Sequence, residues 1–283
     1  MKRVVTTLAV GTLIAAGVFL TAVGGAPIAA GAPTELPQVT IAMDGSSITV
    51  GGTLQSGAVD IVMNVTNESS GEALLVRLNP GVTPDELYQF LASPAAGDPN
   101  NVGDLGAIAF DGGSVAQDSS SDVDTTLEAA EYAALDENGN DPSTFPHTAF
   151  TVAQASQPAT LPTPDATVKA IDFGFRGARS IGRGQIVRFE NDGWVVHMIA
   201  ALRVKNGSDA RELVAALRTG DDRTARHLVT GFVSFLAPVS HGTVEQFAVH
   251  AKPGIYVLAC FMDTQDGREH TLLGMERVFH VTR

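Results

Sequence analysis

The stretch YVLACFMDTQDGREHTLLGMERVFHV, residues 256–281, holds the single cysteine of the 283-residue chain. Cys260 ends an apolar run, and His270 and Met275 come after it. A thiolate, an imidazole and a thioether are ligands that a mononuclear copper site uses. A second imidazole, His197, lies upstream in NDGWVVHMIAALRV, residues 191–204. These four residues are the candidate metal ligands.

Each candidate ligand also has a structural alternative. A lone cysteine in an exported chain has no internal disulfide partner, so Cys260 is buried and inert, reactive, paired between chains, or bound to metal. Cysteine is among the residue types most often buried, and methionine often fills gaps in a core. His197 follows three apolar residues and fits a core-edge imidazole bonded to the backbone. The order His, Cys, His, Met within one half favours the metal hypothesis.

Residues 1–32 have the composition of a signal peptide. Lys2 and Arg3 form a basic start, Val4 to Val23 is almost wholly apolar or small, and GAPIAAGA supplies small residues before a cleavage after Ala32. The sequence therefore predicts export, to the medium or the cell envelope. The apolar stretch is also long enough to span a bilayer, so an uncleaved anchor is the alternative and the one predicted membrane contact.

The charge is acidic and unevenly distributed. The formal net charge is −13. Residues 33–164 contain 18 acidic side chains and one basic side chain, Arg77, whereas residues 165–283 contain 13 acidic and 15 basic side chains. Such a surface repels nucleic acid, so we expect no nucleic-acid partner.

The chain reads as two halves built on one plan. Both GAVDIVMNVTNESSGEALLVRLNPGVTPDELYQFLAS (57–93) and GQIVRFENDGWVVHMIAALRVKNGSDARELVAALRTG (184–220) predict strand, turn, strand and helix. The helix starts are signalled by Thr83-Pro84 with Glu86, and by Ser208 with Asp209 and Glu212. Proline-rich residues 158–166 separate a first domain (33–157) from a second (167–283). Short β-rich runs with one helix per half predict two tandem, mainly all-β sandwiches.

The second half resembles the cupredoxin family. It has an asparagine-containing turn, a strand that begins at the candidate histidine, and a closing Tyr-x-Leu-x-Cys-Phe, Asp-Gly, His and Gly-Met pattern, as in exported cupredoxin-like proteins. The resemblance implies a Greek-key β-sandwich in each half. It also implies one copper ion held by Cys260 as thiolate, His197 and His270 as imidazoles and Met275 as axial ligand. The implied function is one-electron exchange with an unidentified redox partner.

The spacing departs from the blue-copper pattern at one point. Four residues separate His270 from Met275, as in that pattern, but nine separate Cys260 from His270, which is longer. The loop FMDTQDGRE can bulge at Asp266-Gly267 and return His270 to the thiol, or it can place His270 elsewhere.

The first half lacks this ligand set. The internal alignment pairs Glu72 with His197 and Asp136 with Cys260, and Phe150 follows His147 where a methionine would be wanted. We expect an acidic domain without such a copper site. Residues 136–141 offer alternating hard oxygens but match a calcium loop poorly, so an Asn-Gly turn is favoured.

Enzyme signatures are sparse. No G-x-S-x-G, H-E-x-x-H or phosphate loop is present, and the His-Cys-His signature of multicopper oxidases is missing. The sequence therefore predicts no enzyme. Two functions remain open: copper binding by the second domain for electron transfer or copper handling, and a metal-free binding or scaffolding role at the cell envelope.

Overall fold

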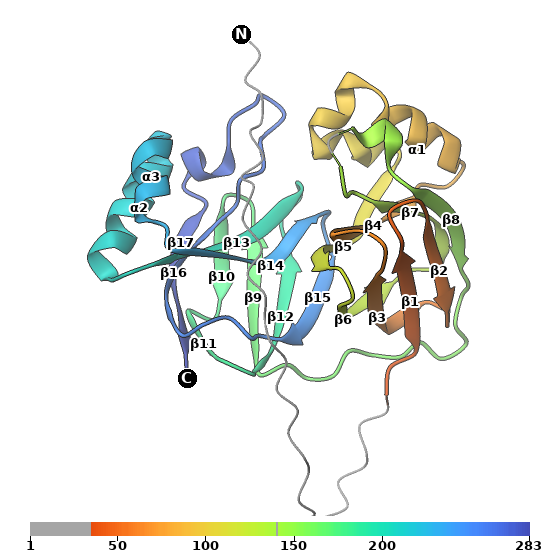
Figure 1. The fold of residues 1–283 in the computed structure, drawn as a ribbon, viewed down its shortest axis with the longest axis horizontal. Coiled ribbons are helices and arrows are strands. Elements are labelled where there is room, and N and C mark those ends of the chain that lie inside the picture. The colour runs from red at the N-terminus through yellow and green to blue at the C-terminus, as the bar shows by residue number, and fades with distance from the viewer. Residues whose placement is uncertain (1–34, 140) are drawn as a thin grey trace, which may run out of the picture. The chain divides into compact units, whose positions relative to one another are not determined.

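The computed structural model describes residues 35–139 and 141–283. The predicted signal segment lies outside the described residues, and export therefore stays a prediction. Leu36–Arg283 forms one compact unit made mainly of β-strands (Figure 1). Among the described residues, no helix is long and apolar enough to cross a membrane.

The first half begins with two short strands and ends with one. Its elements in chain order are β1 (Gln38–Met43), β2 (Ile48–Gly52), β3 (Gly57–Val65), β4 (Ser70–Leu78), α1 (Pro84–Leu91), η1 (Pro94–Gly97), η2 (Pro99–Asp104), β5 (Gly106–Ala116), β6 (Ser120–Leu127), β7 (Ala130–Asp136), η3 (Pro142–Thr144) and β8 (His147–Val152).

The second half follows after a strand-free connection. Its elements are β9 (Ala166–Ile171), β10 (Gly174–Gly177), β11 (Ser180–Gly182), β12 (Ile186–Asn191), β13 (His197–Val204), α2 (Gly207–Thr219), α3 (Asp222–Leu228), β14 (Gly231–Val239), β15 (Val244–Ala248), β16 (Gly254–Ala259), η4 (His270–Leu273) and β17 (Glu276–Thr282).

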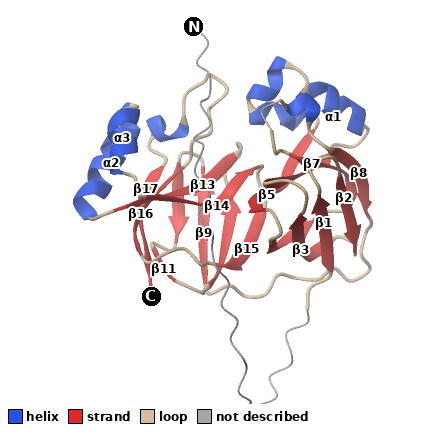
Figure 2. Ribbon diagram, viewed as in Figure 1, coloured by secondary structure: helices blue, strands red, loops and turns tan. Residues whose placement is uncertain are grey.

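Each half is a two-layer sandwich (Figure 2). In the first half, sheet β5-β4-β7-β8 packs through a shared apolar core on β6, β3, β1 and β2. In the second half, β11-β17-β16-β13-β14 packs in the same way on β10, β9, β12 and β15. Alternating side chains on each strand supply these cores, as a period of two requires. The prediction of two tandem, mainly all-β sandwiches is confirmed.

Matching details in the two halves support a duplication. The Tyr132 hydroxyl donates to the Glu128 carbonyl at 3.1 Å, and the Tyr256 hydroxyl donates to the Lys252 carbonyl at 2.6 Å. Both tyrosines are buried, and in each half the accepting carbonyl lies four residues upstream of the tyrosine. The two first strands also repeat, since β1 pairs with β3 and β9 with β12, both in parallel.

The helix starts match the sequence predictions in one case and correct them in the other. Thr83 caps α1 through a reciprocal capping box with Glu86, as predicted. The cap of α2 is Asn206, whose side chain accepts from two backbone amides, so the predicted start at Ser208 is wrong by two residues. A further helix, α3, follows α2, and both cover sheet residues of β13 and β16.

The two halves share one sheet, which no sequence pattern predicts. Strand β15 of the second half pairs with β6 of the first, with Glu245 opposite Thr125. The Thr125 hydroxyl also donates to the Val244 carbonyl at 2.6 Å. The connecting segment is bonded too, because Arg188 donates to the Pro162 carbonyl at 2.9 Å. The boundaries 33–157, 158–166 and 167–283 stay a prediction.

Candidate metal centre

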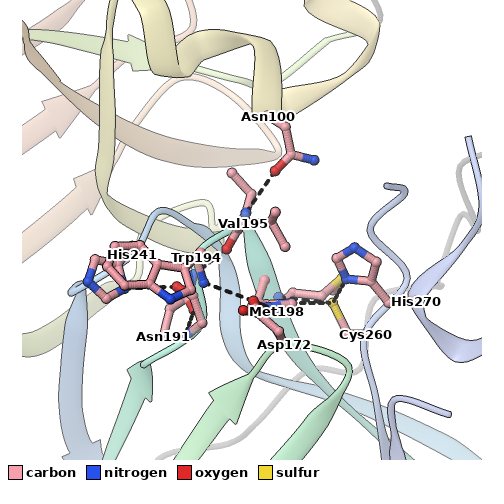
Figure 3. A network of polar contacts seen from close by, with 12 residues as sticks. Asn100, Asp172, Asn191, Trp194, Val195, Met198, His241, Cys260 and His270 are labelled. Atoms are coloured by element: carbon pink, nitrogen blue, oxygen red, sulfur yellow. Dashed lines mark hydrogen bonds and ion pairs between the residues drawn. The ribbon is translucent and has the colours of Figure 1, made fainter. Parts of the chain in front are cut away.

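Three of the four predicted ligands meet at one end of the second sandwich. His197 opens β13, Cys260 directly follows β16, and His270 opens η4. The Cys260 Sγ lies 3.3 Å from Nδ1 of His270 and 3.7 Å from Nδ1 of His197. All three side chains have no exposed surface. The sulfur therefore faces the same nitrogen atom of both rings in a dry site (Figure 3).

These separations fit a shared metal ion. Bond lengths of about 2.3 Å to sulfur and about 2.0 Å to nitrogen place two ligands of one tetrahedral metal about 3.5 Å apart. The two observed distances, 3.3 and 3.7 Å, lie on either side of this value. One soft thiolate with two imidazoles is the donor set that suits copper. The residues present thus fit the ion that the resemblance implies.

The long loop between Cys260 and His270 folds back on itself. The His270 amide donates to the Met262 carbonyl at 2.8 Å, and Asp263 pairs with Glu269 in an isolated bridge. The tip turns at Gly267, where φ is +73°, a value that favours glycine. Because the excursion is closed at its base, nine residues return His270 to the sulfur. Of the two alternatives that the sequence left open, the bulge that returns His270 to the thiol is the one that forms.

Met275 lies beside this loop. Its carbonyl accepts from the Cys260 amide at 3.3 Å, and its own amide donates to the His270 carbonyl at 3.0 Å. Gly274 precedes it with φ of +94°, which turns the chain from η4 into β17. The Met275 side chain is fully buried in the same apolar cluster as Cys260. Its role as a ligand stays a prediction.

Asp172 sets the orientation of His197, and the sequence analysis did not find it. Its Oδ1 lies 3.2 Å from Nε2 of His197 and accepts from the Trp194 amide at 2.8 Å. A proton on Nε2 leaves Nδ1 as the free lone pair that faces sulfur. A side chain at Gly193 would block this contact, since its Cβ would lie 2.5 Å from Nε2 of His197. The only sequence signal for Asp172 is its place in a two-residue turn between two short strands, and that signal is weak.

Phe173, the next residue of this turn, covers His270. Its ring meets the His270 ring edge-on with centroids 5.1 Å apart, and 37% of Phe173 is exposed. Its φ is +57°, which is strained for a bulky residue. Nε2 of His270 is buried and has no hydrogen-bond partner. Packing alone therefore holds the Nε2 side of His270, whereas Nε2 of His197 is hydrogen-bonded to Asp172.

Burial sets the protonation of all three groups. Loss of solvent raises the pKa of the Cys260 thiol to about 12. It lowers the pKa of His270 to about 4, with a further contribution from the neighbouring His197. Burial also lowers the pKa of His197, although Asp172 opposes that shift. At neutral pH the metal-free site therefore holds two neutral imidazoles and a protonated thiol, which would lose its proton to solvent when a metal cation binds the sulfur.

One backbone group is already placed to stabilise the thiolate. The Met198 amide donates to the Cys260 sulfur at 3.4 Å. Met198 directly follows His197 on β13, so one strand supplies both a candidate ligand and a donor to the sulfur. Hydrogen bonds to a copper-bound cysteine tune its redox potential.

The first half corrects the internal alignment. After its first residue, β4 repeats the burial pattern of β13, which places Gly71 where His197 stands. The pairing of Glu72 with His197 is therefore wrong by one residue, whereas Asp136 does occupy the place of Cys260. A Cβ on Gly71 would lie 3.0 Å from the Met43 sulfur, so any larger side chain there would have to displace the Met43 side chain. The thiolate and imidazole set is not repeated in this half.

A separate carboxylate group lies in the first half. Glu72, Asp111 and Glu137 bring ligand oxygens within 4.8 Å of one another. Burial raises the pKa of Glu137 to about 7, with a contribution from Glu72, and raises the pKa of Asp111 well above its usual range. Protonation thus relieves the repulsion between these side chains. Asp136, which is not one of these three residues, accepts hydrogen bonds from the backbone amides of Glu72 and Asn138.

Comparison with solved structures finds copper proteins. Auracyanin A, a "blue" copper protein from Chloroflexus aurantiacus, is 19% identical over 41% of this chain and 96% of its own, with a TM-score of 0.24. The Cu-containing nitrite reductase from Thermus scotoductus is 11% identical over 88% of this chain and 68% of its own (TM-score 0.25). The blue copper oxidase from Nitrosomonas europaea is 9% identical over 88% and 77% (TM-score 0.22).

Comparison with protein-family models and with curated proteins found no match. The expectation of no enzyme needs correction. Chains named as a nitrite reductase and an oxidase match over most of this chain, so sparse motifs do not exclude enzymatic activity for this fold. Identities of 9–11% concern the fold, and no activity of those proteins follows from them.

Proposed function

We propose that the second half binds one copper ion through His197, Cys260 and His270, with Met275 as a weak axial ligand, and exchanges single electrons with a redox partner. One observation carries this proposal. The sulfur and two imidazole nitrogens converge at 3.3 and 3.7 Å in a site without exposed surface. This convergence favours copper binding over the metal-free scaffolding role.

Copper bound at this site supplies a reversible one-electron couple. The protein contributes a fixed set of ligand positions, so little rearranges between the two oxidation states. Asp172 holds one imidazole through its Nε2, and the closed hairpin after Cys260 holds the other. The Met198 amide stabilises negative charge on the sulfur. Phe173 shields His270 from water.

Export belongs to the same proposal. The basic start and apolar run of residues 1–32 support delivery to the cell envelope or the medium. A copper protein in such a compartment meets its redox partner outside the cytoplasm. The acidic first half, with one basic side chain between residues 33 and 164, suits a partner with a basic surface.

Copper titration of the metal-free chain 33–283 tests the proposal. Cu(II) should produce an intense visible band from charge transfer between sulfur and metal, and Cys260→Ser and His270→Ala should abolish it. The control is His280→Ala, since His280 is an exposed histidine on β17. Copper at 100 times its dissociation constant should stabilise the fold by about 2.7 kcal/mol. A colourless protein without added thermal stability would refute copper binding.

A further inference from the structure

A side chain of the first half reaches the candidate metal centre of the second. Asn100 lies in η2, which begins after the capping residue Asp98. Its Oδ1 accepts from the Val196 amide at 2.8 Å, and its Nδ2 donates to the Asp263 carbonyl at 3.0 Å. Figure 3 shows Asn100 above Val195, with a dashed line from its side chain to the backbone of this segment. The contacts join residues 96 and 163 positions apart.

The orientation of this amide follows from its partners. A backbone amide can only donate, so the atom facing Val196 is the oxygen; a backbone carbonyl can only accept, so the atom facing Asp263 is the nitrogen. Asp98 fixes the same side chain, since its Oδ1 accepts from the Asn100 backbone at 2.9 Å and from Nδ2 at 3.1 Å. Contacts within the first half therefore hold the Asn100 side chain in one position, independently of its contacts with the second half.

The two contacts fall next to the two imidazoles. Val196 directly precedes His197 and is buried. Asp263 lies at the base of the hairpin that returns His270, opposite Glu269. One side chain thus ties the strand entry of the first imidazole to the loop of the second. The distance between the ligands depends on both segments, so a tie between them restricts that distance.

We infer that Asn100 is a positioning residue for the metal centre, and that the first half, which lacks the ligand set, serves as a clamp on the ligand segments of the second. The consequence for copper rests on the proposed function. The clamp itself is a property of the metal-free protein and is tested there separately. Its effect on copper is to keep the ligand separation constant between the two oxidation states.

Amide exchange in the metal-free chain tests the clamp. Asn100→Ala removes both contacts, and we expect exchange at the Val196 amide to accelerate about tenfold, the effect of losing one hydrogen bond. Asn100→Asp loses the donor to Asp263 and the donor to Asp98, whose carboxylate then repels the new one, so it should accelerate exchange in residues 262–270. The control is Asn101→Ala, since Asn101 donates within the first half, to the Ala95 carbonyl at 2.9 Å.

Copper-loaded protein gives the second readout. Asn100→Ala should shift the visible band and the reduction potential and release copper about tenfold faster, whereas Asn101→Ala should match the wild type. Unchanged exchange at Val196 in Asn100→Ala would overturn the clamp whether or not copper binds. Faster exchange with an unchanged spectrum and potential would overturn the positioning role. A wild-type chain without a copper band would refute the proposed function, and the exchange data would still decide the clamp.

Discussion

Glu245 makes the stability of the joined halves depend on pH. This side chain lies on β15 at the junction of the two halves, where it is 3% exposed and its Oε1 accepts from the Asp111 amide at 3.3 Å. Burial raises its pKa from 4.5 to about 8. Because the folded protein favours the neutral carboxyl, the stabilisation is complete below pH 4.5 and is lost as pH rises to about 8.

The size of the effect follows from the shift. At about 1.4 kcal/mol per pKa unit, a displacement from 4.5 to about 8 corresponds to about 5 kcal/mol. Glu245→Gln removes the ionisation and keeps an oxygen acceptor for the Asp111 amide. The variant should exceed the wild type in free energy of unfolding by about 1 kcal/mol at pH 5 and by about 5 kcal/mol at pH 9.

Urea unfolding from pH 5 to 9, followed by circular dichroism, measures this difference. The matched control is Glu131→Gln, an exposed glutamate on β7, which should follow the wild type at every pH. A Glu245→Gln difference that stays constant with pH, or a variant less stable than the wild type at pH 9, would show that Glu245 is ionised in the folded protein. That result would contradict the burial of Glu245 at the junction between the halves.

Other predictions concern the buried tyrosine of the second half, the metal site and export. Tyr256→Phe should lower the free energy of unfolding by about 1 kcal/mol, since its hydroxyl bonds a carbonyl at 2.6 Å; an unchanged urea midpoint would contradict this. Gly193→Ala should displace His197 and weaken the copper band, while Gly207→Ala, in open space, should not; equal spectra would argue against the close contact. Met275→Leu should keep the colour and shift the reduction potential, so loss of colour would assign it another role. N-terminal sequencing of the exported protein should begin near residue 33, and Met1 retained in a membrane fraction would favour the anchor.

Local patterns carried the part of the fold that the sequence could predict. Short β-rich runs and the repeated order of strand, turn, strand and helix indicated two sandwiches, because each pattern depends on neighbours along the chain. The four candidate ligands stood in the expected order, and the Asp266-Gly267 turn explained how His270 could return. Each of these features involves residues close together in the sequence, so composition and spacing can indicate it.

Contacts between distant segments were not predictable in this way. No sequence pattern indicated that Asp172 contacts His197, or that Asn100 contacts the segments around the site from the other half. The predicted alignment of β4 with β13 was wrong by one residue, because Gly71 and Glu72 are both compatible with a strand. Only the pairing of β4 with β7 determines which of the two faces the core. The shared sheet through β15 and β6 depends on packing between halves, which no single strand encodes.

X-ray absorption at the copper edge of the loaded chain 33–283 tests the central claim most directly. One sulfur from Cys260 and two nitrogens from His197 and His270 should surround the copper at short distance, and Cys260→Ser should remove the sulfur contribution and no other. Copper surrounded only by oxygen and nitrogen in the wild type, with a spectrum that Cys260→Ser leaves unchanged, would contradict a copper centre at this site.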